Sequence, residues 1–231
     1  RPPISTLFPY TTLFRSIMES LFDVIYLSTV TFLGFQMFIG SKNNTLFKLF
    51  GIMTILLGFG DAFHLVPRMI SLWDKGPETY AFSLGLGKLI TSVTMTVFYV
   101  ILYHIWEIYY KIRNNKNITL AIYFLAFVRI GLLFFPQNDW FNLNSPLIWG
   151  IYRNIPFAIM GLIIIILFYR ESKETNDQVF KYMWIAIILS FGFYVPVVLW
   201  ADAYPLVGML MIPKTCAYVW VVWMGYKEFK R

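Results

Sequence analysis

The sequence predicts an all-α integral membrane protein: a seven-transmembrane-helix bundle with its N-terminus outside and its C-terminus in the cytoplasm. Three observations support this fold class. Hydrophobic residues make up 58% of the chain and charged residues 13%, and the mean hydropathy is +0.64, which is far more apolar than a soluble domain. Seven stretches are long and apolar enough to cross a bilayer, and the basic residues between them gather on one side.

The first sixteen residues differ from the rest of the chain. Their sequence, RPPISTLFPYTTLFRS, resembles the conceptual translation of a sequencing-library adapter, and the likeness stops at Ser16. We therefore expect residues 1–16 to be an adapter-derived artefact, although a basic and partly apolar N-terminus is also typical of a signal peptide. We expect the native chain to begin at Met18, and residues 17–231 to form a single transmembrane domain.

The spans follow from the length that a helix needs, about 20 apolar residues for roughly 30 Å of hydrocarbon. In chain order, the predicted spans are residues 22–39, 49–70, 82–103, 118–135, 147–168, 182–200 and 205–224. The connections are short, at 42–48, 71–81, 111–117, 136–146, 170–181 and 201–203. None of them is long enough to hold a separate domain, and no internal repeat is strong enough to indicate inverted symmetry.

The basic residues beside the spans predict the orientation. One side of the membrane receives Lys42, Lys48, Lys111, Arg113, Lys116, Arg170, Lys173, Lys181, Lys227, Lys230 and Arg231. The other side receives Lys75, with Arg68 at a helix end. The positive-inside rule makes the first side cytoplasmic, so we expect a multi-pass protein of the plasma membrane, or of the inner membrane in a bacterium. The eight tryptophans fall near span ends, where we expect most of them to anchor in the interface.

Ionisable residues inside the spans indicate the functional region, because a charge in hydrocarbon is kept mainly where it faces a partner, a cavity or a ligand. At 1.5 Å per residue, they fall almost entirely in the outer half of the bundle. They are five cations, one histidine and two carboxylates: Arg68, Lys88, Arg129, Arg153, Lys214, His64, Asp61 and Asp202. Asp61, His64 and Arg68 are three and then four residues apart, so they share one helix face.

The cations in this set outnumber the carboxylates. Internal pairs, for example Asp61 with Lys88 or with Arg129, would hold the helices in register, as buried ion pairs often do. Such pairs still leave two or three cations without a counter-ion. A buried lysine can lose its charge, and Arg68 and Lys88 can extend to the interface, which weakens the argument for those two positions.

Arg129, Arg153 and Lys214 are therefore the predicted anion contacts, since the planar fork of arginine suits carboxylate and phosphate. The full set of predicted ligand-binding residues is Asp61, His64, Lys88, Arg129, Arg153, Asp202 and Lys214. The predicted function is binding, with transport or sensing, of a small anionic solute or lipid head group in an outward-facing cationic chamber. Asp61 and His64 would tune the charge of that chamber and carry a proton.

Prolines within the spans give a second indication. Pro156 and Pro213 lie beside Arg153 and Lys214, and Pro196 lies in the sixth span. Each is predicted to remove a helical hydrogen bond and to leave the carbonyl four residues earlier free for another partner. A simple kink is the alternative.

An intramembrane transferase or hydrolase is the alternative function. Asp61 would orient His64 as a general base, and Ser92 or Thr91 on the facing helix would act as the nucleophile. With only two histidines in the chain, a zinc site built from several histidines is not expected. The second histidine, His104, shares a helix face with Glu107, and we interpret the two as an interfacial pair.

A resemblance suggests a further alternative. The segment FYVPVVLW at residues 193–200 resembles the aromatic-proline sixth helix of microbial rhodopsins, and Lys214 lies in the seventh span, where those proteins carry retinal. The resemblance implies retinal binding through Lys214. The chain departs from the family at Leu210, where those proteins often have an acid, and at Lys88, the charged residue of a third span that offers no carboxylate counter-ion.

A third alternative function is that of an accessory or assembly subunit whose charges pair with another protein, and an oligomer or a partner subunit would then be expected.

The composition of the chain argues against two other classes of protein. The chain has no basic tail or patch suited to nucleic acid. The single cysteine, Cys216, excludes an intrachain disulfide and a multi-thiolate metal site. Besides the retinal alternative, we predict no cofactor and no metal.

Overall fold

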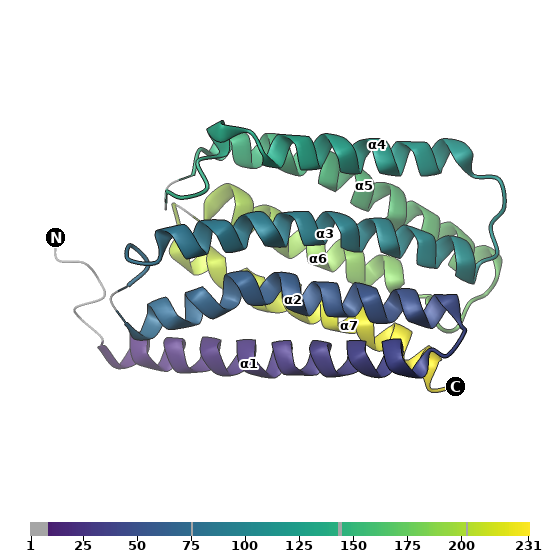
Figure 1. The fold of residues 1–231 in the computed structure, drawn as a ribbon, viewed down its shortest axis with the longest axis horizontal. Coiled ribbons are helices and arrows are strands. Elements are labelled where there is room, and N and C mark those ends of the chain that lie inside the picture. Colours follow the sequence, from purple (N-terminus) through teal and green to yellow (C-terminus); the bar gives the residue numbers. More distant parts are fainter. Residues whose placement is uncertain (1–8, 75, 143–144, 202) are drawn as a thin grey trace.

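The computed structural model describes residues 9–74, 76–142, 145–201 and 203–231, and the regular structure in these ranges is entirely helical. The long helices are α1 (Pro9–Gly40), α2 (Thr45–Trp73), α3 (Ala81–Tyr109), α4 (Lys116–Leu133), α5 (Leu147–Glu174), α6 (Met183–Trp200) and α7 (Met211–Phe229) (Figure 1). Two short 3-10 helices, η2 (Pro136–Asn138) and η3 (Pro205–Leu210), precede α5 and α7. The predicted all-α fold with seven apolar helices is confirmed.

All seven long helices are long and apolar enough to cross a membrane, which makes the chain a multi-pass membrane protein. Several helices are longer than predicted, and α3 and α5 each end six residues past the predicted ends of their spans, at Tyr109 and Glu174. Large apolar side chains face outward, including Phe127, which is 77% exposed, and Ile39, which is 76% exposed. Hydrocarbon around the bundle accounts for such side chains better than water does.

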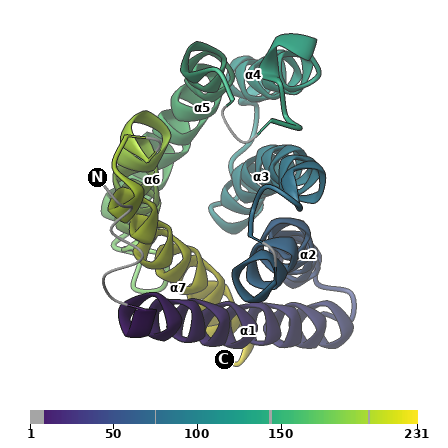
Figure 2. The same ribbon diagram turned by 90° about the vertical axis from the view of Figure 1, so that its left-hand side faces the viewer.

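The helices are arranged in the order in which they occur in the chain. Each long helix packs against the next, and α7 closes the arrangement by packing against α1 and α2 (Figure 2). Because the number of long helices is odd, α1 begins at one end of the bundle and α7 ends at the other (Figure 1). We call the end at which α1, α3, α5 and α7 begin the first end, and the opposite end, which carries the C-terminus, the second end.

Helices α2 and α3 approach each other closely because two glycines lie between them. A Cβ atom on Gly87 would lie 2.2 Å from the backbone oxygen of Phe63. Pro67, four residues after Phe63, has no N–H to donate to that oxygen, so the ladder of α2 is interrupted at the point of contact. Farther along, the Thr91 hydroxyl donates to the backbone oxygen of Gly60 at 2.9 Å. The polar face of α2 that carries Asp61 and His64 is therefore held against α3.

Aromatic side chains fill the centre of the bundle. Tyr99 of α3 is fully buried and meets the ring of Phe157 of α5 edge-on, with 4.9 Å between the centroids. Phe98 meets Tyr218 of α7 in the same way at 5.5 Å. Such contacts are favourable for aromatic pairs. They join α3, α5 and α7 into one core.

The structure corrects the interpretation of two tryptophans. Trp106 is 1% exposed and belongs to the core, and Trp140 is 8% exposed in the connection between α4 and α5. Neither faces the lipid as an interfacial anchor would. A position near a span end does not indicate whether the indole ring faces the core or the lipid.

The prolines of the predicted spans lie at different places in their helices. Pro156 and Pro196 lie inside α5 and α6, as expected. Pro213, however, is the third residue of α7, in the first turn. The 3-10 helix η3 runs directly into α7, because Leu210 and Met211 both have helical backbone angles. A freed carbonyl beside Lys214 stays a prediction.

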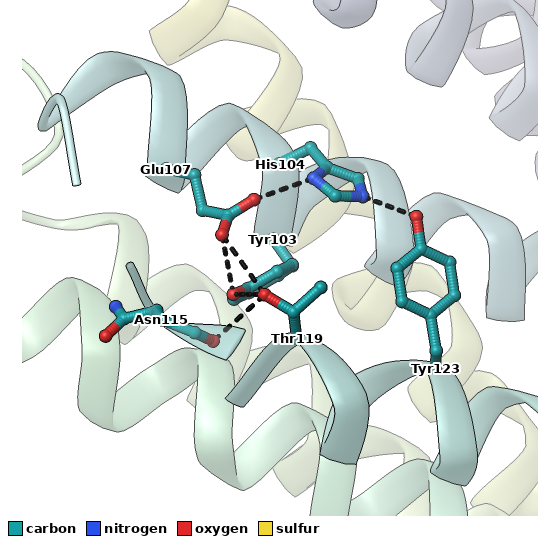
Figure 3. Close-up of polar contacts among 6 residues, drawn as sticks. All are labelled: Tyr103, His104, Glu107, Asn115, Thr119 and Tyr123. Carbon is teal, nitrogen blue, oxygen red and sulfur yellow. Dashed lines mark hydrogen bonds and ion pairs between the residues drawn. The ribbon is translucent and has the colours of Figure 1, made fainter. Parts of the chain in front are cut away.

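At the second end, α3 and α4 are joined by a network of polar side chains (Figure 3). Nδ1 of His104 lies 2.8 Å from Glu107 Oε2, and its Nε2 lies 2.8 Å from the hydroxyl of Tyr123. The Tyr103 hydroxyl donates to Glu107 Oε1 at 2.8 Å and lies 2.8 Å from the hydroxyl of Thr119. The predicted pairing of His104 with Glu107 is confirmed, and the network fastens the two helices together.

The connection between α5 and α6 is anchored by one carboxylate. Asp177 accepts hydrogen bonds from the hydroxyl of Tyr110 at 2.8 Å and from the backbone N–H of Val179 at 2.8 Å and of Phe180 at 3.0 Å. Burial, together with this hydrogen bond, raises the pKa of Tyr110 well above its ordinary value, so its hydroxyl keeps the proton that it donates. The loop is thereby tied into the core, where Phe180 is fully buried.

Candidate functional site: a cationic cavity

A cavity of about 360 Å³ lies between the helices at the first end of the bundle. All the long helices except α1 contribute to its lining, together with the connection between α4 and α5. Its polar lining residues are His64, Arg68, Lys88, Thr91, Ser92, Arg129, Ser145, Arg153, Asn154, Tyr194, Lys214 and Tyr218. No carboxylate occurs among the lining residues in the described part of the chain.

Five of the seven predicted ligand-binding residues line this cavity: His64, Lys88, Arg129, Arg153 and Lys214. Asp61 does not line it, and Asp202 lies outside the described residues. Helix α3 faces the cavity with Lys88, Thr91, Ser92 and Met95. Positions 150, 153, 154 and 157 of α5 form a similar stripe, because residues three or four apart share a helix face.

Arg129 is the most deeply buried of these cations. It lies near the end of α4 and is 2% exposed. Its guanidinium carbon lies 3.4 Å from the centroid of the Phe157 ring. Its Nε and Nη1 atoms have no hydrogen-bond partner among the described residues. A buried charged group with unpaired donors is costly, so its retention calls for a functional reason.

Arg153 is held by the connection that follows α4. Its Nη1 donates to Asn138 Oδ1 at 2.9 Å, and its guanidinium carbon lies 4.2 Å from the ring of Trp140. Asn138 is fully buried and donates through Nδ2 to backbone carbonyls where α4 ends. Trp140 Nε1 likewise donates to the carbonyl of Leu133 at 2.8 Å. The side chains that satisfy the free carbonyls at the end of α4 thus also position Arg153.

Lys214 lines the cavity from α7 and lies against two tyrosine rings. Its Nζ is 4.6 Å from the centroid of the Tyr194 ring and 5.6 Å from that of Tyr218. No ion pair to Lys214 forms within the described part of the chain. Arg129, Arg153 and Lys214 therefore share one property: their direct contacts are aromatic rings or a neutral amide.

Arg68 differs from these three because it has a carboxylate partner. Its Nε forms an ion pair with Glu19 of α1, with side-chain exposures of 33% for Arg68 and 14% for Glu19. The prediction that Arg68 extends to the interface overlooked this partner. Lys88 lines the cavity from α3 and acts electrostatically on His64.

Sequence reasoning missed the acidic face of α1. Glu19, Asp23 and Tyr26 are spaced four and three residues apart, and Val30 continues the same buried face. Asp23 is 5% exposed, and its Oδ2 has no hydrogen-bond partner among the described residues. Tyr26 donates to Asp61 Oδ2 at 2.6 Å. The helical spacing was the signal that could have found these residues, but the predicted span began at residue 22 and set the acids at its edge.

The predicted catalytic arrangement is not assembled. Asp61 accepts its hydrogen bond from Tyr26, not from His64. The Nδ1 atom of His64 has no partner in the described part of the chain. The hydroxyl of Ser92 donates to the backbone oxygen of Lys88 at 2.7 Å. Among these residues, no hydrogen bond joins the acid to the base, and none joins the base to the nucleophile.

Comparison of the chain with protein-family models, with curated proteins and with solved structures gives no match. Within the described residues, no group of three or more His, Cys, Asp or Glu side chains could hold a metal ion. Retinal binding through Lys214 stays a prediction.

Proposed function

We propose that the protein binds a small anionic solute, or the anionic head group of a lipid, in the cationic cavity. The recognised group would be a carboxylate or a phosphate. The observation that carries the proposal is Arg129, a fully buried guanidinium with two nitrogens that have no partner among the described residues. Arg153 and Lys214 add two more positive charges whose direct contacts are neutral.

The aromatic contacts suit this role. A ring packed against a guanidinium covers its flat face and leaves the N–H donors, which lie in the plane, available to a ligand. Arg129 on Phe157 and Arg153 on Trp140 have this arrangement. The rings fix the positions of the cations without neutralising them. An arriving carboxylate or phosphate can then accept charge-assisted hydrogen bonds from groups that are already oriented.

The distribution of basic residues supports an outward-facing cavity. The connections at the second end carry most of the lysines and arginines outside the spans, which favours the cytoplasm for that end. The cavity lies at the first end. We therefore place the N-terminus outside and propose that the ligand enters from the outer side, for transport or for sensing.

The test uses the purified protein in detergent, with sulfate, inorganic phosphate, acetate and succinate as titrants in isothermal calorimetry. We expect at least one of these anions to bind, and Arg129→Gln to weaken that binding by about 30-fold, or about 2 kcal/mol, the worth of a charge-assisted hydrogen bond. Arg170→Gln is the matched control, because Arg170 lies at the second end of α5 with 66% of its side chain exposed.

A second arm distinguishes a free anion from a lipid. Native mass spectrometry of the protein with anionic phospholipid would show bound lipid in the wild type and in Arg170→Gln but not in Arg129→Gln. Binding of a titrant without lipid would identify a soluble anion. The proposal fails if every probe binds equally well to the wild type and to a folded Arg129→Gln variant, or if none binds to the wild type.

A further inference from the structure

We propose that the ligand of the cavity is a hydroxylated organic anion, in which hydroxyl groups accompany the carboxylate or phosphate. A hydroxy acid, a glycerol phosphate and a lipid head group built from glycerol phosphate share this chemistry. The inference rests on the proposed function, because it concerns the same cavity. It describes the part of the ligand that the cations do not contact, and it assigns the residues of α3 and α6 that bind this part.

Two hydroxyl groups of α3 line the cavity with their protons already committed. The Thr91 hydroxyl donates to the backbone oxygen of Gly60 at 2.9 Å, and the Ser92 hydroxyl donates to that of Lys88 at 2.7 Å. A carbonyl oxygen carries no proton, so the hydroxyl must be the donor at these distances. Each hydroxyl oxygen keeps lone pairs. Thr91 and Ser92 can therefore accept a hydrogen bond from a ligand but have no proton left for an anion.

The wall of the cavity that α6 forms has the same polarity. The Tyr194 hydroxyl donates to Asn154 Oδ1 at 3.1 Å. The amide of Asn154 is held in this orientation because its Nδ2 donates to the backbone oxygen of Gly150 at 2.8 Å. The Tyr194 oxygen, like those of α3, therefore offers lone pairs to a ligand. The other residues that α6 contributes to the lining, Val197 and Val198, are apolar.

The lining is thus divided by hydrogen-bond polarity. The cations Arg129, Arg153 and Lys214 offer only donors, whereas the three hydroxyl groups of α3 and α6 offer acceptors. A simple anion carries acceptors alone, so it would remove water from the hydroxyl oxygens without replacing the lost hydrogen bonds. A ligand that satisfies both sets carries an anionic group and at least one hydrogen-bond donor.

The donor of the ligand is expected to be a neutral hydroxyl group. An ammonium group also donates, but five cations line the cavity, and no carboxylate does so in the described part of the chain. The charges that attract the anion would repel a positive group. The volume of about 360 Å³ is in the range of pockets that hold small organic molecules. A short hydroxylated chain therefore has room beside the anionic group.

The experiment compares anions that differ in their hydroxyl groups. Calorimetry of the purified protein in detergent would pair glycerol 3-phosphate with propyl phosphate, and glycerate with propionate. Each pair has the same kind of anionic group and the same carbon chain length. We expect the hydroxylated member of each pair to bind about tenfold tighter or more, the worth of one or two neutral hydrogen bonds. Phosphoethanolamine should bind more weakly than glycerol 3-phosphate, because its ammonium group is repelled.

Variants assign this preference to particular hydroxyl groups. Tyr194→Phe keeps the ring that lies against Lys214, and Thr91→Val keeps the shape of the side chain. Each should lower the preference for the hydroxylated anion by roughly three- to tenfold. Thr96→Val is the matched control, because Thr96 of α3 also donates to a backbone oxygen, at 2.8 Å, but does not line the cavity. It should keep the wild-type preference.

Native mass spectrometry with an equal mixture of phosphatidylglycerol and phosphatidic acid distinguishes the two sources of the ligand. Retention of phosphatidylglycerol, without binding of the soluble anions, would support a lipid head group, whereas the expected preference among the soluble anions would support a free solute. If both members of every pair bind equally well and Arg129→Gln weakens both, the hydroxyl assignment is wrong and the anion site stands. Tighter binding of phosphoethanolamine, or a wild-type preference in both Thr91→Val and Tyr194→Phe, would also overturn the assignment. If no anion and no anionic lipid binds to the wild type, both proposals fall together.

Discussion

Replacement of Arg129 with methionine is expected to stabilise the ligand-free protein, although the residue is almost completely buried. Core substitutions usually destabilise a protein. Arg129 is different because the residue is 2% exposed and two of its guanidinium nitrogens have no partner among the described residues. Methionine fills a similar length of side chain with apolar atoms and removes the buried charge.

The magnitude follows from the contacts. An unpaired buried polar group costs about 1–3 kcal/mol, so two nitrogens cost roughly 2–6 kcal/mol. The contact with the Phe157 ring offsets about 2 kcal/mol of this cost, since it is a desolvated cation–π contact. The expected net gain is about 2 kcal/mol for Arg129→Met. In a protein of this size, that gain raises the melting temperature by roughly 4–8 °C.

The assay is thermal unfolding of the purified protein, followed by tryptophan fluorescence in a buffer without carboxylate or phosphate. Arg153→Met is the matched control. Arg153 donates to Asn138 at 2.9 Å, so its loss leaves a buried oxygen unpaired and should lower stability by about 1–3 kcal/mol. The two variants should therefore move the melting temperature in opposite directions. A fall for Arg129→Met as large as that for Arg153→Met would refute the reasoning, because Arg129 would then have a structural partner.

Two further predictions concern the frame around the cavity. Gly87→Ala should cost about 1–3 kcal/mol, because its Cβ would meet a backbone oxygen of α2 at 2.2 Å, whereas Gly131→Ala, with no atom within 4 Å, should cost nothing in the same melting assay. Equal effects of the two alanines would contradict the close packing of α2 and α3. Glu19→Gln should lower the melting temperature by the equivalent of about 1 kcal/mol, because Arg68 loses its charged partner. Glu174 forms an exposed ion pair with Arg170, so Glu174→Gln should leave the melting temperature unchanged. A lower melting temperature in both variants would indicate a general effect of charge removal.

The fold and the main cations of the cavity could be predicted because they depend on local patterns. The length of an apolar stretch fixes the number of spans, and the helical period fixes which residues share a face. Lys88 with Thr91 and Ser92, for example, faces the cavity as that period requires. These patterns survive errors of several residues in the predicted helix ends.

The partners of the charges could not be predicted in the same way, because they come from elsewhere in the chain. Glu19 reaches Arg68 across 49 positions, and Tyr26 reaches Asp61 across 35. Asn138 lies in the connection between α4 and α5. Nothing in the sequence of that connection indicates that the Asn138 amide joins the end of α4 to Arg153. Helix packing decides such contacts, and a period within one helix carries no information about the rotation of its neighbour.

The bundle treats its cations in two ways, and the difference bears on function. Arg68 also lines the cavity, but it ties α2 to α1 through an ion pair in which the Glu19 carboxylate neutralises it. Where Arg129, Arg153 and Lys214 face the cavity, an aromatic ring supports each of them and leaves its charge in place. If these three cations served only to hold the helices in register, a carboxylate partner beside each of them would stabilise the fold more than a ring does, since an unpaired buried cation is costly. This arrangement supports the proposed binding of an anion, whose negative charge would neutralise the three cations.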